Sequence, residues 1–228
     1  MARSLRPALL LPFCVLGLSW LRSAPQEPAI ASFKITDEVE APEPERVRSE
    51  DVWLHPTRFM GRTIAFDVQI HSELASWNPM LTRFGSGEFR GFRCWSDEQF
   101  PWDQLDFRYP RVRVFARLGS AAEWALEGSE RYARFELICD VRSNHAGQPW
   151  VEVVAVKPRL RRLGEGGIIH ASRGLESMAI KNWAAAIDEF ERANVGGIPP
   201  RAKDELERLI DECREKQKRI LTPIDESR

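Results

Sequence analysis

Arg-Val-Arg-Val-Phe-Ala-Arg-Leu, residues 111 to 118, is the clearest strand signal in the chain. Its side chains alternate between two sets, and alternate side chains of a β-strand point to opposite faces. The apolar set, expected in a core, is Val112, Val114, Ala116 and Leu118. The other set, expected to point outward, is Arg111, Arg113, Phe115 and Arg117. We therefore predict a strand with one core face and one face rich in arginine.

Four further strands and one short helix are predicted around this strand. The strands are Thr63–His71, Gly91–Trp95, Arg131–Arg142 and Trp150–Lys157. Ser120 and Glu123 have the spacing of a capping box, which predicts a helix that Gly128 ends. The order strand, strand, strand, helix, strand, strand is that of the OB-fold, a small five-stranded barrel. We expect an α+β protein in which residues 52–163 form an OB-like β-barrel.

Two short runs carry a more specific resemblance. Pro56-x-x-Phe59-x-Gly61-Arg62-x-Ile64-x-Phe66-x-Val68 enters the first strand, and Pro149-Trp150-Val151-Glu152-Val153 opens the last. Together they resemble exported bacterial OB-fold proteins of the tRNA-anticodon-like group, in which a Pro-x-x-aromatic-x-Gly-basic run enters the first strand. The resemblance covers about half of the chain. This chain differs from the group in its long first loop and in lacking a glycine soon after the first strand.

The C-terminal part has helical periodicity. Residues 164–170, which begin Gly-Glu-Gly-Gly, are expected to be a linker, and the predicted helices are Ala171–Ile180, Trp183–Asn194 and Arg201–Arg219. The run Ala186-x-x-x-Phe190-x-x-Ala193, with Gly174 before it and Pro199 after it, resembles a single degenerate tetratricopeptide repeat. We expect residues 171–228 to form a tetratricopeptide-like helical hairpin with a capping helix. The hairpin either offers a peptide groove or only covers the open side of the barrel.

The N-terminal residues have the pattern of a secretory signal peptide. Arg3 and Arg6 precede an apolar run over residues 8–21, and Ala29-Ile30-Ala31 is a small-x-small cleavage site. The apolar run is shorter than the ~20 residues that span a bilayer, so we expect no transmembrane segment in the mature chain. We predict a signal peptide over residues 1–31 and export to the periplasm or cell envelope. The alternative is a retained interfacial anchor.

Residues 32–51 combine seven acidic side chains with Pro42 and Pro44. Such a composition can bury little apolar surface, and it predicts a disordered leader. The whole chain has a formal net charge of −1 at pH 7. That balance gives no reason to expect nucleic acid or a membrane surface as the main partner.

Catalytic and metal-binding patterns are absent from the sequence. It has no Cys-x-x-Cys and no His-x-x-x-His spacing, so we predict no metal site, no cofactor and no catalytic residue. After export three cysteines remain, which are Cys94, Cys139 and Cys213. Cys94 and Cys139 are both predicted to point inward, and sequence leaves open whether they are bonded or are free core thiols. We therefore predict that the protein is not an enzyme.

The candidate binding residues lie on the second and third predicted strands, which are neighbours in an OB barrel. Phe92 and Cys94 are predicted inward, so Arg93 and Trp95 point outward with Arg113, Phe115 and Arg117. Guanidinium groups beside aromatic rings can hold an anion, stack on a base or sugar, or anchor a protein. The alternative is that acidic residues or the C-terminal helices cover this face.

These patterns predict an exported, non-enzymatic binding or scaffolding protein that interacts with a protein partner. A second hypothesis is an oligonucleotide- or glycan-binding barrel that uses the face of the second and third strands. A third is an enzyme whose motif is not recognisable. The fold alone cannot decide among them, because one fold carries many functions.

We predict that the mature protein begins at Ser32, since signal peptidase cleaves after small-x-small sequences such as Ala29-Ile30-Ala31. Edman sequencing of the protein purified from the envelope fraction tests this. A soluble cytoplasmic chain that keeps Met1 would contradict both the signal peptide and the predicted compartment.

Overall fold

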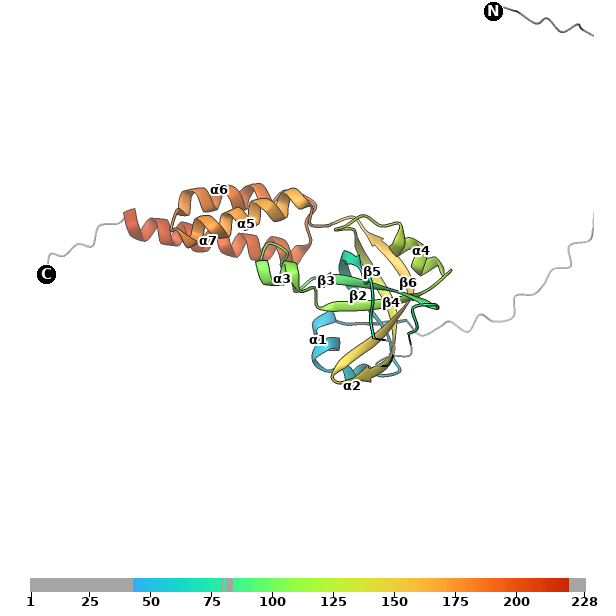
Figure 1. The fold of residues 1–228 in the computed structure, drawn as a ribbon. Helices are drawn as coiled ribbons and strands as arrows, with labels where there is room; N and C mark the ends of the chain where they lie inside the picture. The colour runs from blue at the N-terminus through green and yellow to red at the C-terminus, as the bar shows by residue number, and fades with distance from the viewer. Residues whose placement is uncertain (1–42, 79, 81–83, 222–228) are drawn as a thin grey trace, which may run out of the picture. The chain divides into compact units, whose positions relative to one another are not determined.

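Five strands pair in a closed ring in the computed structural model, which describes residues 43–78, 80 and 84–221. The strands are β2 (Thr63–Glu73), β3 (Phe89–Ser96), β4 (Val112–Arg117), β5 (Arg134–His145) and β6 (Gln148–Arg159). The neighbours are β2–β3, β3–β4, β4–β6, β6–β5 and β5–β2. All pairs are antiparallel except β4–β6, which is parallel. With the C-terminal helices, this sheet makes the protein a mixed α+β fold (Figure 1), as predicted.

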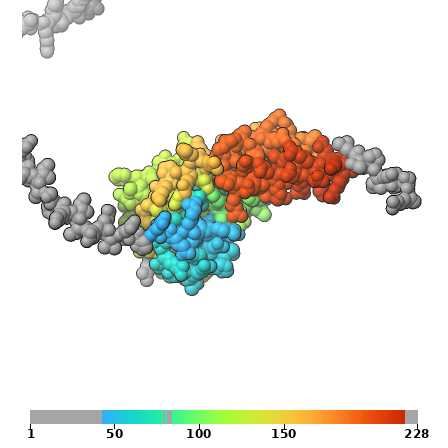
Figure 2. All heavy atoms as spheres, turned by 180° about the vertical axis from the view of Figure 1, so that it is seen from behind, coloured from blue at the N-terminus to red at the C-terminus, as the bar shows by residue number. Residues whose placement is uncertain are grey.

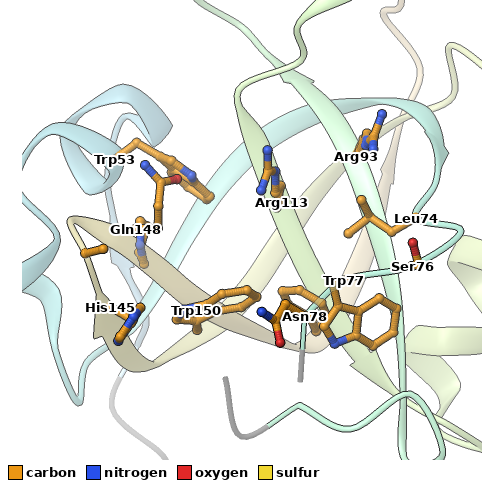
Figure 3. Close-up of a pocket in the computed structure, with 13 residues that line it drawn as sticks. Trp53, Leu74, Ser76, Trp77, Asn78, Arg93, Arg113, His145, Gln148 and Trp150 are labelled. Carbon is orange, nitrogen blue, oxygen red and sulfur yellow. The ribbon is translucent and has the colours of Figure 1, made fainter. Parts of the chain in front are cut away.

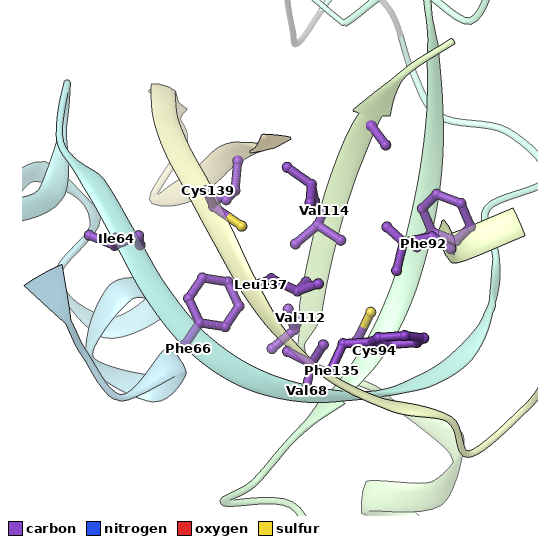
Figure 4. Packing of buried hydrophobic residues seen from close by; sticks show 14 of the residues in the cluster. Ile64, Phe66, Val68, Phe92, Cys94, Val112, Val114, Phe135, Leu137 and Cys139 are labelled. Carbon is purple, nitrogen blue, oxygen red and sulfur yellow. The ribbon is translucent and has the colours of Figure 1, made fainter. Parts of the chain in front are cut away.

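The predicted alternation along the strands places the main core inside the ring. Val112, Val114 and Ala116 of β4 are at most 1% exposed, and they meet Phe66 of β2 and Leu137 of β5 in one cluster (Figure 4). Phe92 and Cys94 of β3 also point inward, as predicted. Leu118 was predicted to join them, and this was wrong. It is 39% exposed because β4 ends at Arg117.

Cys94 and Cys139 do not form a disulfide in this structure. Cys94 and Cys139 are both free and fully buried in the core inside the ring. Burial raises the pKa of each thiol well above its usual value, because the apolar surroundings disfavour the thiolate. The two cysteines are therefore unreactive core residues in this structure, and the disulfide alternative is not present.

The predicted leader ends earlier than expected. Residues 1–31, the predicted signal peptide, lie outside the described residues, as does most of the leader. The prediction that the leader extends to residue 51 was wrong, because β1 (Glu45–Arg46) pairs with β2. Helix α1 (Ser49–Leu54) follows, and the Ser49 hydroxyl donates to Glu98 at 2.9 Å. The N-terminal part of the described chain, blue in Figure 2, packs directly against the strands. Long-range packing supplies the stabilisation that their own composition lacks.

Three short helices complete the part of the chain around the ring. Helix α2 (Pro56–Phe59) leads into β2, and α3 (Gln104–Arg108) lies between β3 and β4. Helix α4 (Ala121–Glu127) begins as predicted, because the Ser120 hydroxyl accepts from the Glu123 amide at 3.1 Å. Helix α3 was not predicted. Its N-terminus is satisfied by the Asp103 carboxylate, which accepts from two amides of the first turn.

The C-terminal region contains α5 (Glu165–Ala179), α6 (Trp183–Ala193) and α7 (Pro200–Leu221). Residues 164–170 were predicted to be a linker, and this was wrong for all but the first residue, because α5 begins at Glu165. The cause is tertiary packing, since Ile168 is 6% exposed in a second apolar cluster. Trp102, from the segment before α3, belongs to the same cluster. None of the helices in the described residues has the length and hydropathy needed to cross a membrane.

Helices α5 and α6 approach closely at one glycine. A methyl group on Gly174 would lie 2.4 Å from the ring of Phe190, which is fully buried. The ring is held by Ala186 and Ala193, also buried, so it has no open space into which to move. The small residue predicted at position 174 therefore has a packing reason.

Replacing Gly174 with alanine should lower the free energy of unfolding by about 1–3 kcal/mol, because the methyl group overpacks the helix interface. The matched control is Gly166→Ala in the same helix, where an added methyl group meets nothing within 4 Å. That control should change stability by less than about 1 kcal/mol, in the stabilising direction. Urea unfolding followed by circular dichroism measures both. Equal effects of the two substitutions would contradict the close packing.

Candidate functional site

The candidate site lies on the outer face of β3 and β4. Arg93 lies directly opposite Arg113 across the two strands, and Gly91 lies opposite Phe115. Phe89 lies opposite Arg117 in the same register. Side chains two residues apart on a strand share a face. The five predicted site residues therefore point away from the core inside the ring, and none of them belongs to that cluster.

Two of the five are covered rather than open to solvent. Trp95 is 1% exposed and Phe115 is fully buried, so of the two alternatives for this face the covered one applies to these two residues. The Tyr132 ring stacks on Trp95 at a centroid distance of 5.5 Å, and His71 meets it at 4.7 Å. A period of two gives the direction of a side chain, but it does not say which distant residues will cover it.

Phe115 is covered by a cluster of aromatic side chains on the outer side of the closed ring of strands. Phe84 stacks on it at 4.8 Å, Trp77 meets its edge at 5.2 Å, and Trp150 lies at 5.2 Å. The Trp77 indole donates to the Phe84 carbonyl at 2.6 Å, which fixes the connection after β2 over the sheet. Phe115 is therefore the buried floor of the site and not a ring on its surface.

Arg117 is exposed but already has partners. Its guanidinium lies 4.7 Å from the centre of the Phe89 ring and 3.5 Å from the Glu152 carboxylate. A neighbouring arginine, Arg142, also pairs with Glu152, at 2.7 Å. Exposed pairs of this kind contribute little stability, but they neutralise the charge of Arg117. Arg117 is therefore the least available of the three predicted arginines.

Arg93, Arg113 and Phe115 line one cavity of about 300 Å³ (Figure 3). Four parts of the chain surround it, namely α1, the connection after β2, the β3–β4 pair and the β5–β6 hairpin. The side chains that add to the predicted ones include Trp53, Leu74, Trp77, His145, Gln148 and Trp150. The site is therefore a cavity walled by residues distant in sequence, and not a flat surface.

The charged side chains that line the cavity among the described residues are all positive. The described residues that line it include Arg93 and Arg113 but neither aspartate nor glutamate. Both arginines are exposed. Among the described residues, neither guanidinium has an ion-pair or hydrogen-bond partner. Like charges directly opposite each other on neighbouring strands are destabilising. Arg93 also acts on His71, whose pKa is lowered by burial and by the positive charges of Arg131 and Arg93.

Three tryptophans of the cavity were not predicted as site residues. Trp53 and Trp77 are half-buried, and Trp150 is 8% exposed. The buried indole N–H of Trp150 has no hydrogen-bond partner within the described part of the chain. A sequence signal existed for Trp150, because Val151 and Val153 point inward and the alternation puts Trp150 outside. Trp77 offered a weaker signal, as a large aromatic residue in a turn-rich connection.

The cavity offers two guanidinium groups of the kind that pair with anions, and its walls provide aromatic rings and hydrogen-bond donors. No group of three or more His, Cys, Asp or Glu side chains in the described residues could hold a metal ion. Cavities that bind small ligands commonly combine apolar and aromatic walls with a few polar groups that fix orientation. The arrangement matches that description.

No protein-family model matches the chain, and no curated protein matches it. The resemblances seen in the sequence therefore stay predictions.

Proposed function

We propose that the chain is an exported, non-enzymatic binding protein of the periplasm or cell envelope, and that its ring of strands is an OB-like barrel. The closed pairing of five strands supports the barrel, since closure removes exposed strand edges. The position of α4 between β4 and β5 supports the OB order of strands. The signal-peptide pattern of residues 1–31 supports export.

The cavity is the proposed binding site. OB barrels bind ligands on their second and third strands and with the loops after the first and fourth strands. In this chain those strands are β3 and β4, and the loops are the connections from β2 to β3 and from β5 to β6. Residues of both strands and both loops line the cavity. The correspondence supports a ligand site here rather than elsewhere on the sheet.

The observation that carries the proposal is the pair formed by Arg93 and Arg113. Two exposed guanidinium groups lie opposite each other without a carboxylate among the described residues around them. An anionic ligand placed between them would relieve their repulsion and gain charge-assisted hydrogen bonds. We therefore propose that the ligand is an anion.

An anionic ligand should raise the melting temperature of the protein by roughly 5–10 °C at about 100 times its Kd, since binding stabilises only the folded state. Differential scanning fluorimetry with hexaglutamate, trigalacturonate, glucose 6-phosphate and the oligonucleotide dT12 tests this. The double substitution Arg93→Ser and Arg113→Ser should abolish the shift. It should not lower the melting temperature of the free protein, because neither side chain has a partner to lose.

The matched control is Arg161→Ser, which removes an exposed arginine that does not line the cavity. This variant should keep the full shift. If none of the four anions stabilises the wild-type protein, or if the double variant responds as the wild type does, the proposed anion site is wrong.

A second candidate function is protein binding by the helical region, for which we propose a tetratricopeptide-like arrangement. The observation that favours it is a cavity of about 540 Å³ between α5 and the segment that contains α3. Its walls include Trp102, Phe107, Ile168, Ile169 and Leu175, and the charged residues that line it are Asp103 and Glu176. An apolar peptide segment with a basic side chain suits such a surface.

Ile169→Glu tests this second function, because Ile169 is 43% exposed and the substitution places a charge in the groove without disturbing the core. We expect the variant to fold normally and to lose the proteins that the wild type cross-links in the native envelope. Quantitative mass spectrometry of both samples gives the comparison. An unchanged set of cross-linked proteins would exclude the groove as their binding site.

A further inference from the structure

We infer that the ligand of the Arg93–Arg113 cavity is a sugar ring bearing an anionic group, that is, an acidic unit of a glycan. This inference rests on the anion-binding function proposed above and specifies its ligand. Four properties of the cavity support it: the nature of its walls, the number of free charges, a buried unpaired donor and its size.

Apart from the two arginines, much of the wall of the cavity is formed by aromatic side chains. Trp53 comes from α1, Trp77 from the connection after β2, and Trp150 from β6, so rings approach the cavity from three elements (Figure 3). Trp53 and Trp77 keep part of their surface exposed. Aromatic faces of this kind contribute apolar contact area to a flat or ring-shaped ligand. A small inorganic anion would use the arginines and leave these surfaces wet.

On β3 and β4, the arginines without an ion-pair partner among the described residues are Arg93 and Arg113, and both line the cavity. Arg90 and Arg117, on the same two strands, pair with Glu123 at 3.0 Å and with Glu152 at 3.5 Å. Arg142, close by on β5, pairs with Asp140 at 2.9 Å. Single-stranded nucleic acids are held by a positive groove that follows the phosphate backbone. Here Arg93 and Arg113 together suit a single anionic group. The arginines that already have ion-pair partners do not continue the positive charge along the sheet.

The polar groups of the cavity also suit a polyhydroxylated ligand. Gln148 and Ser76 line it with neutral groups that both donate and accept hydrogen bonds. The Trp150 indole N–H has no partner among the described residues, and a buried donor without a partner is destabilising. A ligand hydroxyl can accept this bond if the ring turns toward it on binding. Carboxylate-bearing peptides offer fewer such neutral acceptors for the same volume.

The size of the cavity limits the ligand to a small unit. A volume of about 300 Å³ lies at the lower end of the ~300–1,000 Å³ range of ligand pockets. One sugar ring with its charged substituent is therefore the expected occupant. Neighbouring units of the glycan would extend over the rim between α1 and the β5–β6 hairpin, both of which border the cavity.

Isothermal titration calorimetry with defined probes tests the inference on the full mature chain. Trigalacturonate carries sugar rings with carboxylates, hexaglutamate carries carboxylates without sugars, maltotriose carries sugars without charge, and dT12 carries phosphates with bases. Glucose 6-phosphate distinguishes a phosphorylated from a carboxylated sugar. We expect an acidic sugar, either trigalacturonate or glucose 6-phosphate, to bind at least tenfold more tightly than hexaglutamate, maltotriose and dT12. Its binding should change the intrinsic tryptophan fluorescence.

Two variants separate the contributions to this affinity. Arg93→Ser should weaken the acidic sugar by about tenfold or more, as expected for loss of a hydrogen bond to a charged group. Trp150→Phe keeps an aromatic ring but removes the indole N–H, and should weaken the acidic sugar by about fivefold. It should leave hexaglutamate binding unchanged. The melting temperature of each variant, measured alongside, shows that it is folded.

The outcomes distinguish the inference from the function on which it rests. Preferential binding of hexaglutamate or dT12, lost in the Arg93→Ser variant, would leave the anion site standing and overturn the sugar. Binding of maltotriose as tight as that of the acidic sugars would remove the role given to the charge. Absence of binding by every anion would overturn both. If an acidic sugar binds the Arg93→Ser variant as tightly as the wild type, its binding site does not lie in this cavity.

Discussion

The pairing of β2 on both of its edges is the constraint on which the rest of the structure depends. One edge meets β3 and the other meets β5, so the sheet returns to its first strand. Once the ring is closed, every side chain of these strands is either inside with Phe66 and Val114 or outside. The interior is filled by apolar residues. The strands therefore leave room for a cavity only on their outer side, where α1, the connection after β2 and the β5–β6 hairpin surround Arg93 and Arg113.

The parts of the fold that sequence could predict are those fixed by neighbours along the chain. Alternation with a period of two gave the five strands and the inward position of residues such as Val112. The spacing of Ser120 and Glu123 gave the start of α4, because a capping bond forms within one turn. The resemblance to a tetratricopeptide repeat implied a small residue at position 174, and in the structure Gly174 packs against Phe190.

The parts that sequence missed depend on contacts between distant residues. Glu45 and Arg46 look like part of a solvated leader until β2 offers them a strand edge. Trp95 points outward as its position requires, but Tyr132 and His71 then cover it. For the site residues, sequence could predict to which face of the sheet each side chain points. It could not predict which side chains would stay accessible to solvent. Arg93 and Arg113 were found because they are polar on an outward face, whereas Trp53 reaches the cavity from another element.

The Arg93–Arg113 pair also shows where this protein gives up stability. A chain selected for stability alone would place a carboxylate near one of these arginines, as Glu152 lies 3.5 Å from Arg117. Cross-strand pairs of opposite charge contribute roughly 0.2–1 kcal/mol, whereas like charges directly opposite each other are destabilising. Arg93→Glu would therefore raise the stability of the protein, and its carboxylate would repel the anion proposed to bind beside Arg113. Selection for thermostability that left binding unmonitored would favour such substitutions first.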